Sequence, residues 1–158
     1  MLPHSAAEID FNALRERIAG QFPLGRHSIH GPSHWERVDA WGQRLSDSTP
    51  GADLIVVRLF AVFHDSQRFN ECTDPRHGAR GAAFAQLVHG DWFDVGRARL
   101  RVLMQACERH ELGETSNDPT IGCCWDADRL DLPRVSIEPD PFFMSTAFGK
   151  SAAGRYIR

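Results

Sequence analysis

The sequence predicts a single-domain, all-α protein built as a bundle of about six helices. Two observations predict this class. Apolar residues recur at helical spacing in segments separated by Gly and Pro, and the alternation of β-branched residues typical of strands is missing. A chain of 158 residues with 42% hydrophobic content can bury one substantial core, which leaves little room for a second. We therefore expect residues 1–158 to form one domain.

The pattern places three helices in the first half of the chain. The first, over residues 5–19, begins after Ser5 and ends near Gly20. The second covers residues 33–47. The third lies in "GADLIVVRLFAVFHD", which is apolar on all sides between Leu54 and Phe63 except at Arg58. Such a helix is expected at the buried centre of the bundle.

The second half is predicted to hold three more helices, over residues 77–89, 95–110 and 121–130. Pro133 ends the last of them, because proline disfavours the helical conformation of the residue before it. Residues 133–158 are expected to be irregular, with at most a short helix around residues 142–148.

Composition narrows the classes of partner and compartment. The net charge is −3 with both signs interspersed, so neither a nucleic-acid duplex nor a membrane surface is an expected partner. The chain has no secretory signal pattern and no run of eighteen apolar residues, which favours a cytoplasmic location. The cysteines lack CxxC spacing and are expected to be buried, reduced thiols. They are Cys72, Cys107, Cys123 and Cys124.

Five predicted helices each carry an imidazole or a carboxylate on the apolar stripe, close to a helix end. A single inward histidine is more often a hydrogen-bonded core residue than a ligand. Several together favour a metal site, because uncompensated buried carboxylates would each cost several kcal/mol while a divalent cation neutralises them together. The candidates are His34, His64, Asp65, His77, His110 and Asp128.

The segment "TIGCCWDADRLDLP" holds three aspartates that are expected to differ in role. Asp128 shares the core-facing stripe, Asp126 projects to the opposite side, and Asp131 lies at the margin of the stripe. An ion pair between Arg129 and a carboxylate such as Asp126 is the expected role of that arginine.

These residues carry a resemblance to a known family. The order of His34, the pair His64-Asp65 at the end of a buried helix, and Asp128 in "DADRLD" resembles the HD-domain superfamily of metal-dependent phosphohydrolases. "HGPSHWERV" looks like the family's first-histidine segment, and the likeness covers roughly residues 27–132. His77 in "DPRHGARGA" and His110 in "ACERHELGE" extend it to the six-ligand, dinuclear branch.

The resemblance implies an all-α HD-type bundle that binds one or two divalent transition metal ions, drawn from Mn, Fe, Co, Ni and Zn. It implies that one metal is held by four residues and that Asp65 bridges to a second metal held by His77 and His110. The four ligands of the first metal would be His34, His64, Asp65 and Asp128.

Residues beside the implied ligands are candidates for substrate contact. Many family members continue the HD pair with a hydrophobic residue, glycine and lysine, whereas this chain reads "HDSQR". Arg68 would then supply the basic group beside the catalytic Asp65, although a solvated surface arginine is an equal alternative. His30 could contact substrate or simply cap a helix.

The expected function is hydrolysis of a phosphoester or phosphoanhydride by metal-activated water. The expected substrate is a small phosphorylated metabolite, with nucleotides the favoured class. Two alternatives stay open: a mixed-valent di-iron oxygenase of the same fold, and a non-catalytic metal-binding regulatory module. A homodimer also stays open.

Overall fold

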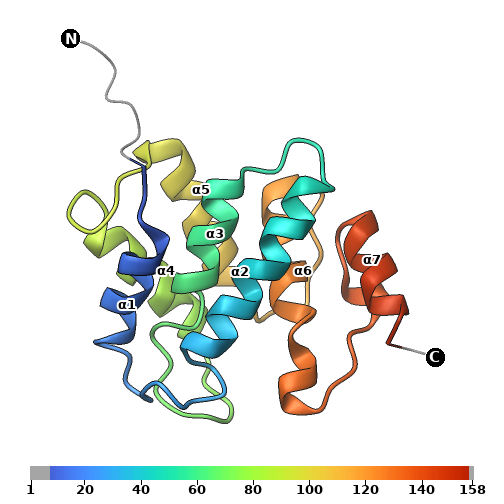
Figure 1. The fold of residues 1–158 in the computed structure, drawn as a ribbon, viewed down its shortest axis with the longest axis horizontal. Coiled ribbons are helices and arrows are strands. Elements are labelled where there is room, and N and C mark those ends of the chain that lie inside the picture. Colours follow the sequence, from blue (N-terminus) through green and yellow to red (C-terminus); the bar gives the residue numbers. More distant parts are fainter. Residues whose placement is uncertain (1–7, 157–158) are drawn as a thin grey trace.

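The structure of the protein is a computed structural model that describes residues 8–156. Figure 1 shows helices joined by loops, and residues 8–156 contain no β-strand. The predicted all-α class is therefore confirmed. The helices are α1 Phe11–Ala19, α2 Pro32–Asp47, α3 Leu54–Phe63, α4 His77–Val88, α5 Gly96–Arg109, α6 Pro119–Arg129 and α7 Ala147–Gly154, with the 3-10 turns η1 Leu132–Val135 and η2 Pro141–Phe143 before α7.

Helix α3 lies at the centre of the bundle, as its apolar sequence predicted. It packs against α1, α2, α4, α5 and α6, and seven of its ten residues are buried. Its one charged residue, Arg58, donates hydrogen bonds to both carboxylate oxygens of Asp39 on α2, at 2.9 and 3.0 Å. This pairing neutralises a charge that would otherwise face the core. The end of α3 at Phe63 places the following residues deep in the molecule.

The predicted boundaries of the second to sixth helices agree with the structure within two residues. The first helix starts later than predicted. Residues 5–7 lie outside the described part of the chain, and residues 8–10 are not helical. Helix α1 starts at Phe11 because the Asp10 side chain accepts a hydrogen bond from the Ala13 N–H at 2.9 Å, which caps the helix there.

The segment after Pro133 contains more regular structure than the predicted single short helix. Its described part, up to Tyr156, contains two 3-10 turns and α7, and the helix expected over residues 142–148 forms later, at Ala147–Gly154. Thr146 sets this start, because its hydroxyl accepts a hydrogen bond from the Gly149 N–H at 2.9 Å. Helix α7 lies against α6 at the end of the molecule opposite α1 (Figure 1).

Asp126 explains how this segment is held against α6. Its side chain projects away from Asp128 as predicted, but it is fully buried. It accepts hydrogen bonds from the N–H of Ser145 at 2.7 Å and from both the N–H and the hydroxyl of Thr146, at 2.8 and 2.7 Å. The carboxylate is therefore a binding point for the chain that leads into α7.

The predicted ion pair between Arg129 and Asp126 does not form. Arg129 instead donates hydrogen bonds to the backbone carbonyls of Glu114 and Phe143, at 2.5 and 2.6 Å. The backbone N–H groups of the C-terminal segment occupy Asp126, so the arginine bonds to carbonyl oxygens of the Glu114 loop and of η2. Both residues therefore hold neighbouring segments of the chain against α6 by hydrogen bonds.

The prediction for the cysteines is correct for three of the four. Cys107, Cys123 and Cys124 are free, buried thiols as predicted, but Cys72 is exposed and that part of the prediction is wrong.

None of the helices within residues 8–156 is long and apolar enough to cross a membrane.

Candidate metal centre

The structure brings all six candidate ligands together at the middle of the bundle. They come from α2, the end of α3, the start of α4, the end of α5, and α6. Three overlapping groups have ligand atoms that all lie within 4.8 Å of one another. The groups are His34, His64 and Asp65; His64, His110 and Asp128; and Asp65, His77 and His110.

The first half-site consists of His34, His64 and Asp128. The Nε2 atoms of the two histidines lie 3.0 Å apart. One carboxylate oxygen of Asp128 lies 3.1 Å from His34 Nε2 and 3.4 Å from His64 Nε2. Both histidine side chains are fully buried, so these polar atoms have no bulk water to satisfy them.

The second half-site consists of His77 and His110, whose Nε2 atoms also lie 3.0 Å apart. Asp65 stands between the two half-sites. Its Oδ2 lies 3.4 Å from His34 Nε2 and 3.6 Å from His64 Nε2, while its Oδ1 lies 3.0 Å from His77 Nε2 and 3.4 Å from His110 Nε2. One oxygen of this carboxylate thus faces each half-site, which is the arrangement of a bridging ligand.

The hydrogen bonds of the four histidines determine where their protons lie. Each Nδ1 faces an acceptor, so each Nδ1 carries the proton and each Nε2 of a neutral ring presents a lone pair. The acceptors are Asp131 for His34, the Phe60 and Ala61 carbonyls for His64, the Asp74 carbonyl for His77, and the Cys107 carbonyl for His110.

Two lone pairs 3.0 Å apart, with carboxylate oxygens beside them, repel one another unless positive charge lies between them. The donor set therefore fits two divalent cations, one in each half-site, with neutral imidazole and carboxylate ligands. Such a mixed set suits Mn, Fe, Co, Ni or Zn better than Mg or Ca, which prefer oxygen ligands.

In the metal-free site, the pKa of each of these groups is shifted by its burial and by its charged neighbours. Burial by itself would lower the pKa of His34, but hydrogen bonds to Asp128, Asp131 and Asp65 outweigh burial and raise this pKa to about 10. Burial lowers the pKa of His64. The pKa of Asp65 is held well below its usual range because surrounding histidines outweigh the effect of its burial. The carboxylates of the site are therefore ionised and suited to binding a cation.

Two glycines of α4 allow the second half-site to assemble. A side chain at Gly78 would overlap the carbonyl oxygen of Cys107 on α5, and one at Gly81 would come within 2.6 Å of the Phe63 carbonyl oxygen. Without side chains at these positions, α4 approaches both α5 and the end of α3 closely. That approach brings His77 to His110 and Asp65.

Comparison with known proteins identifies the fold. No protein-family model matches the chain, and no curated protein matches it. A crystal structure of a predicted HD superfamily hydrolase from an uncultured Thermotogales bacterium matches with a TM-score of 0.70 and 21% sequence identity, over 93% of this chain and 83% of that one. The chain has the HD-superfamily fold. The resemblance seen in the sequence is thereby confirmed for the fold, while metal binding by the six residues stays a prediction.

Within this HD-type fold, sequence reasoning missed the role of Asp131. Its Oδ2 lies 2.6 Å from His34 Nδ1, and its Oδ1 accepts a hydrogen bond from Arg37 Nε at 2.8 Å. Asp131 therefore orients His34 rather than only marking the end of a stripe. Its position three residues after Asp128, on nearly the same helical face, is the sequence signal that could have revealed this role.

Arg68 is buried beside the centre, so the alternative of a solvated surface arginine is wrong. Only 9% of the residue is exposed, and its Nε lies 3.8 Å from Asp65 Oδ1. Its Nη1 donates to the Cys72 carbonyl at 3.1 Å, whereas Nε is buried without a hydrogen-bond partner. The guanidinium thus has unused donor capacity next to the bridging carboxylate.

His30 is also buried, with its ring between the Glu71 carbonyl and Asp65. Its Nε2 lies 2.9 Å from the Glu71 carbonyl and therefore carries the ring proton. The remaining Nδ1 lies 3.6 Å from Asp65 Oδ2 and has no hydrogen-bond partner. His30 therefore presents an acceptor toward the centre instead of capping α2.

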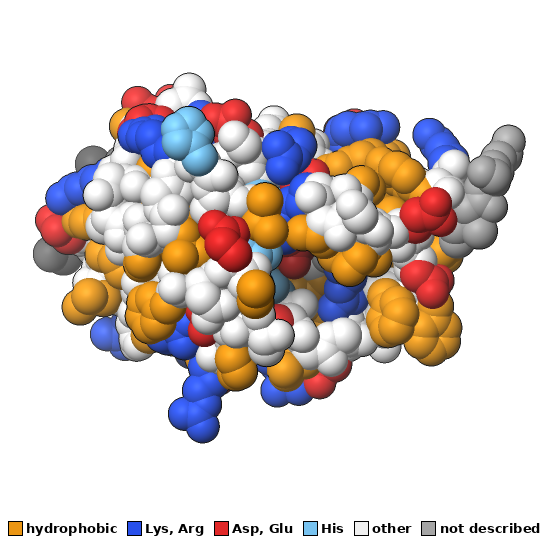
Figure 2. All heavy atoms as spheres, turned by 90° about the horizontal axis from the view of Figure 1, so that it is seen from below, with side chains coloured by type: hydrophobic (Ala, Val, Ile, Leu, Met, Phe, Trp, Pro, Cys, Tyr) orange, Lys and Arg blue, Asp and Glu red, His pale blue; other side chains and the backbone are white. Residues whose placement is uncertain are grey.

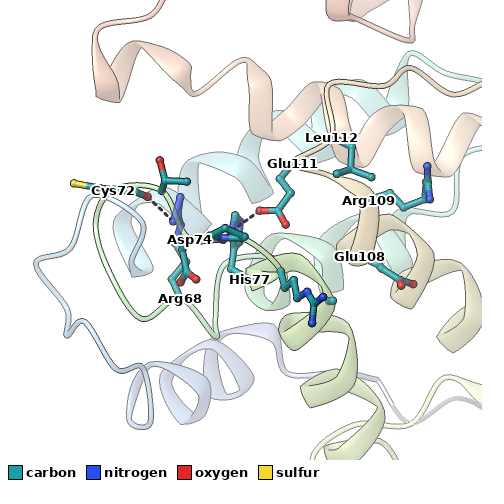
Figure 3. A pocket seen from close by; sticks show the side chains of 12 residues that line it. Arg68, Cys72, Asp74, His77, Glu108, Arg109, Glu111 and Leu112 are labelled. Carbon is teal, nitrogen blue, oxygen red and sulfur yellow. Dashed lines mark hydrogen bonds and ion pairs between the residues drawn. The ribbon is translucent and has the colours of Figure 1, made fainter.

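A cavity of about 1080 Å³ opens beside the second half-site, with Arg68, His77 and Glu111 among its lining residues (Figure 3). None of the first half-site's residues lines this cavity. The space-filling view in Figure 2 shows histidine surface recessed in a hollow near the middle of one face. Access from this cavity is therefore to the second half-site.

Proposed function

We propose that the protein is a metal-dependent phosphohydrolase whose centre is formed by the six candidate ligands. One observation carries this proposal: two pairs of facing histidine Nε2 atoms, each pair 3.0 Å apart, are joined by the two oxygens of Asp65. The relative of the same fold is described as a predicted HD superfamily hydrolase, which supports the hydrolase class.

Divalent ions held in this centre would lower the pKa of water and neutralise charge on a phosphoryl group. Side chains of the protein would supply the other interactions. Asp65 faces both half-sites, Asp131 holds the His34 ring, and His30 Nδ1 can accept a hydrogen bond from a water molecule or a substrate hydroxyl near Asp65. The buried surroundings strengthen each of these electrostatic contacts.

The cavity next to His77 suggests how substrate is held. A phosphate oxygen placed there could accept the hydrogen bond that Arg68 Nε leaves unused, beside Asp65. The cavity, at about 1080 Å³, lies near the upper limit of known small-molecule sites, which is roughly 1,000 Å³. We propose a small phosphorylated metabolite as substrate, with nucleotides the first class to test.

The test combines metal analysis with phosphate release. Protein purified without oxygen is analysed for bound metals and assayed with nucleotides and other phosphate esters in the presence of Mn²⁺, Co²⁺ or Fe²⁺. We expect up to two metals per chain and metal-dependent phosphate release. Asp65→Ala should lose both, because it removes the ligand shared by the two half-sites. Asp47→Asn, at an exposed position, should change neither.

Three outcomes would contradict the proposal. Two bound iron ions with consumption of O₂ and no phosphate release would indicate the oxygenase. Bound metal with neither activity would indicate a regulatory module. Unchanged metal content in Asp65→Ala would show that the metal binds elsewhere.

A further inference from the structure

Glu111 makes a contact that the proposed function leaves unexplained. It follows His110 at the end of α5, and its Oε2 lies 2.5 Å from His77 Nδ1. Figure 3 shows Glu111 pointing across the cavity wall to His77, while Glu108 on the same side points away from that ring. Glu111 thus contacts one ligand of the second half-site and directly follows the other.

The first half-site contains a matching contact. There, Asp131 lies 2.6 Å from His34 Nδ1, so each half-site has one histidine whose Nδ1 faces a carboxylate. The other histidine of each half-site, His64 or His110, faces only backbone carbonyls. The pattern repeats although Glu111 and Asp131 come from different helix ends.

The two carboxylates differ in charge balance. Asp131 is paired with Arg37 at 2.8 Å, which offsets its charge. Among residues 8–156, Glu111 has no arginine or lysine within ion-pair distance. The charge of Glu111 therefore acts on His77 without a counter-ion. The Asp74 carbonyl accepts the hydrogen bond from His77 Nδ1 at 2.8 Å and orients the ring, while the nearby carboxylate makes Nε2 a stronger ligand.

We propose that Glu111 is a positioning residue that strengthens metal binding by His77 in the second half-site, the one that opens to the cavity. This inference rests on the proposed function for the presence of a second metal. It assigns Glu111 to that metal alone, because no atom of the first half-site is within ion-pair distance of Glu111.

The structure also indicates that a Glu111 variant will fold. His77 Nδ1 lies 2.8 Å from the Asp74 carbonyl as well, so its proton keeps an acceptor when the carboxylate is removed. Glu111 is on the cavity wall, where loss of its side chain leaves no buried void.

The experiment measures the affinities of both metals by titrating metal-free protein with Co²⁺ and following its visible absorption. Glu111→Ala should weaken the second metal by about 10–100-fold and leave the first unchanged. Glu111→Gln, which keeps a hydrogen-bond acceptor, should recover part of that loss. Glu108→Ala, on the same wall, is the matched control and should bind both metals as the unmodified protein does.

Asp131→Asn completes the design, because it should weaken the first metal and spare the second. If the unmodified protein binds two metals and Glu111→Ala binds both equally well, the role of Glu111 is wrong and the dinuclear centre stands. If the unmodified protein binds one metal and His77→Ala has no effect on it, the dinuclear centre and the role of Glu111 are both wrong. Equal losses in Glu111→Ala and Glu108→Ala would also overturn the inference.

Discussion

Arg68 illustrates how a single residue acquires its role from its surroundings. It is three residues beyond Asp65, and the turn after α3 carries its guanidinium back to within 3.8 Å of that carboxylate. Burial of an arginine is costly unless its donors find acceptors, yet Nε has none within residues 8–156. The cavity on its other side is where an anionic group could supply that acceptor.

We predict that Arg68→Gln lowers kcat/KM for phosphate-ester hydrolysis by roughly 10–100-fold, the value of about one charged hydrogen bond. Metal content should be unchanged because Arg68 is not among the ligand groups. Steady-state kinetics and metal analysis of the same preparation check this. Arg76→Gln, an exposed change on the cavity wall, is the comparison, and equal losses in both variants would argue against a specific role for Arg68.

Helices α6 and α7 show how close packing holds one helix against another. Helix α6 is buried on nearly every side, since the core covers the face with Cys124 and the C-terminal segment covers the face with Asp126. Gly149 on α7 makes this contact possible, because a Cβ there would overlap the Asp126 carboxylate. Three hydrogen bonds hold that carboxylate in place, so it cannot move aside without loss.

We therefore predict that Gly149→Ala lowers the free energy of unfolding by about 1–3 kcal/mol, despite the higher helix propensity of alanine. This corresponds to a fall in Tm of several degrees. Gly154→Ala is a matched control in the same helix, because its Cβ would meet nothing nearer than the Pro141 ring at 4.0 Å. Thermal unfolding of both variants decides the matter, and an unchanged Tm for Gly149→Ala would contradict this account of the contact.

For the whole molecule, the cluster of buried histidines and carboxylates links stability to both metal and pH. Without metal, His34 has its pKa raised from 6.5 to about 10. A raised pKa of a basic group adds stability that is fully present below about pH 6.5 and is lost as the pH rises toward about 10. Metal that takes the place of this proton removes that loss, so the stabilisation by metal should grow with pH.

We predict that the difference in Tm between Mn²⁺-loaded and chelator-treated protein increases from about pH 6.5 to pH 8.5. Thermal unfolding of both forms, with oxygen excluded, measures it. His34→Gln should abolish the trend, whereas His27→Gln, at an exposed position, should retain it. A constant difference across this range would contradict the linkage between His34 and the metal.

Periodicity determined much of this protein, because helical spacing is a local property that the sequence carries directly. The positions of α2 to α6, the central place of α3, and the inward direction of His34, His64, His77, His110 and Asp128 all followed from it. These residues lie far apart along the chain, and only the fold was needed to bring them into contact.

Long-range contacts were decided only by the tertiary structure. Local spacing could not show that Asp131 and Glu111 face the Nδ1 atoms of histidines 97 and 34 positions away along the chain. Local spacing also could not show that the C-terminal segment buries Asp126. Helix α7 of that segment has only 8 residues, so its periodicity is a weak signal in the sequence. These contacts depend on how helices approach one another, and that is set by packing at Gly78, Gly81 and Gly149 rather than by any local preference.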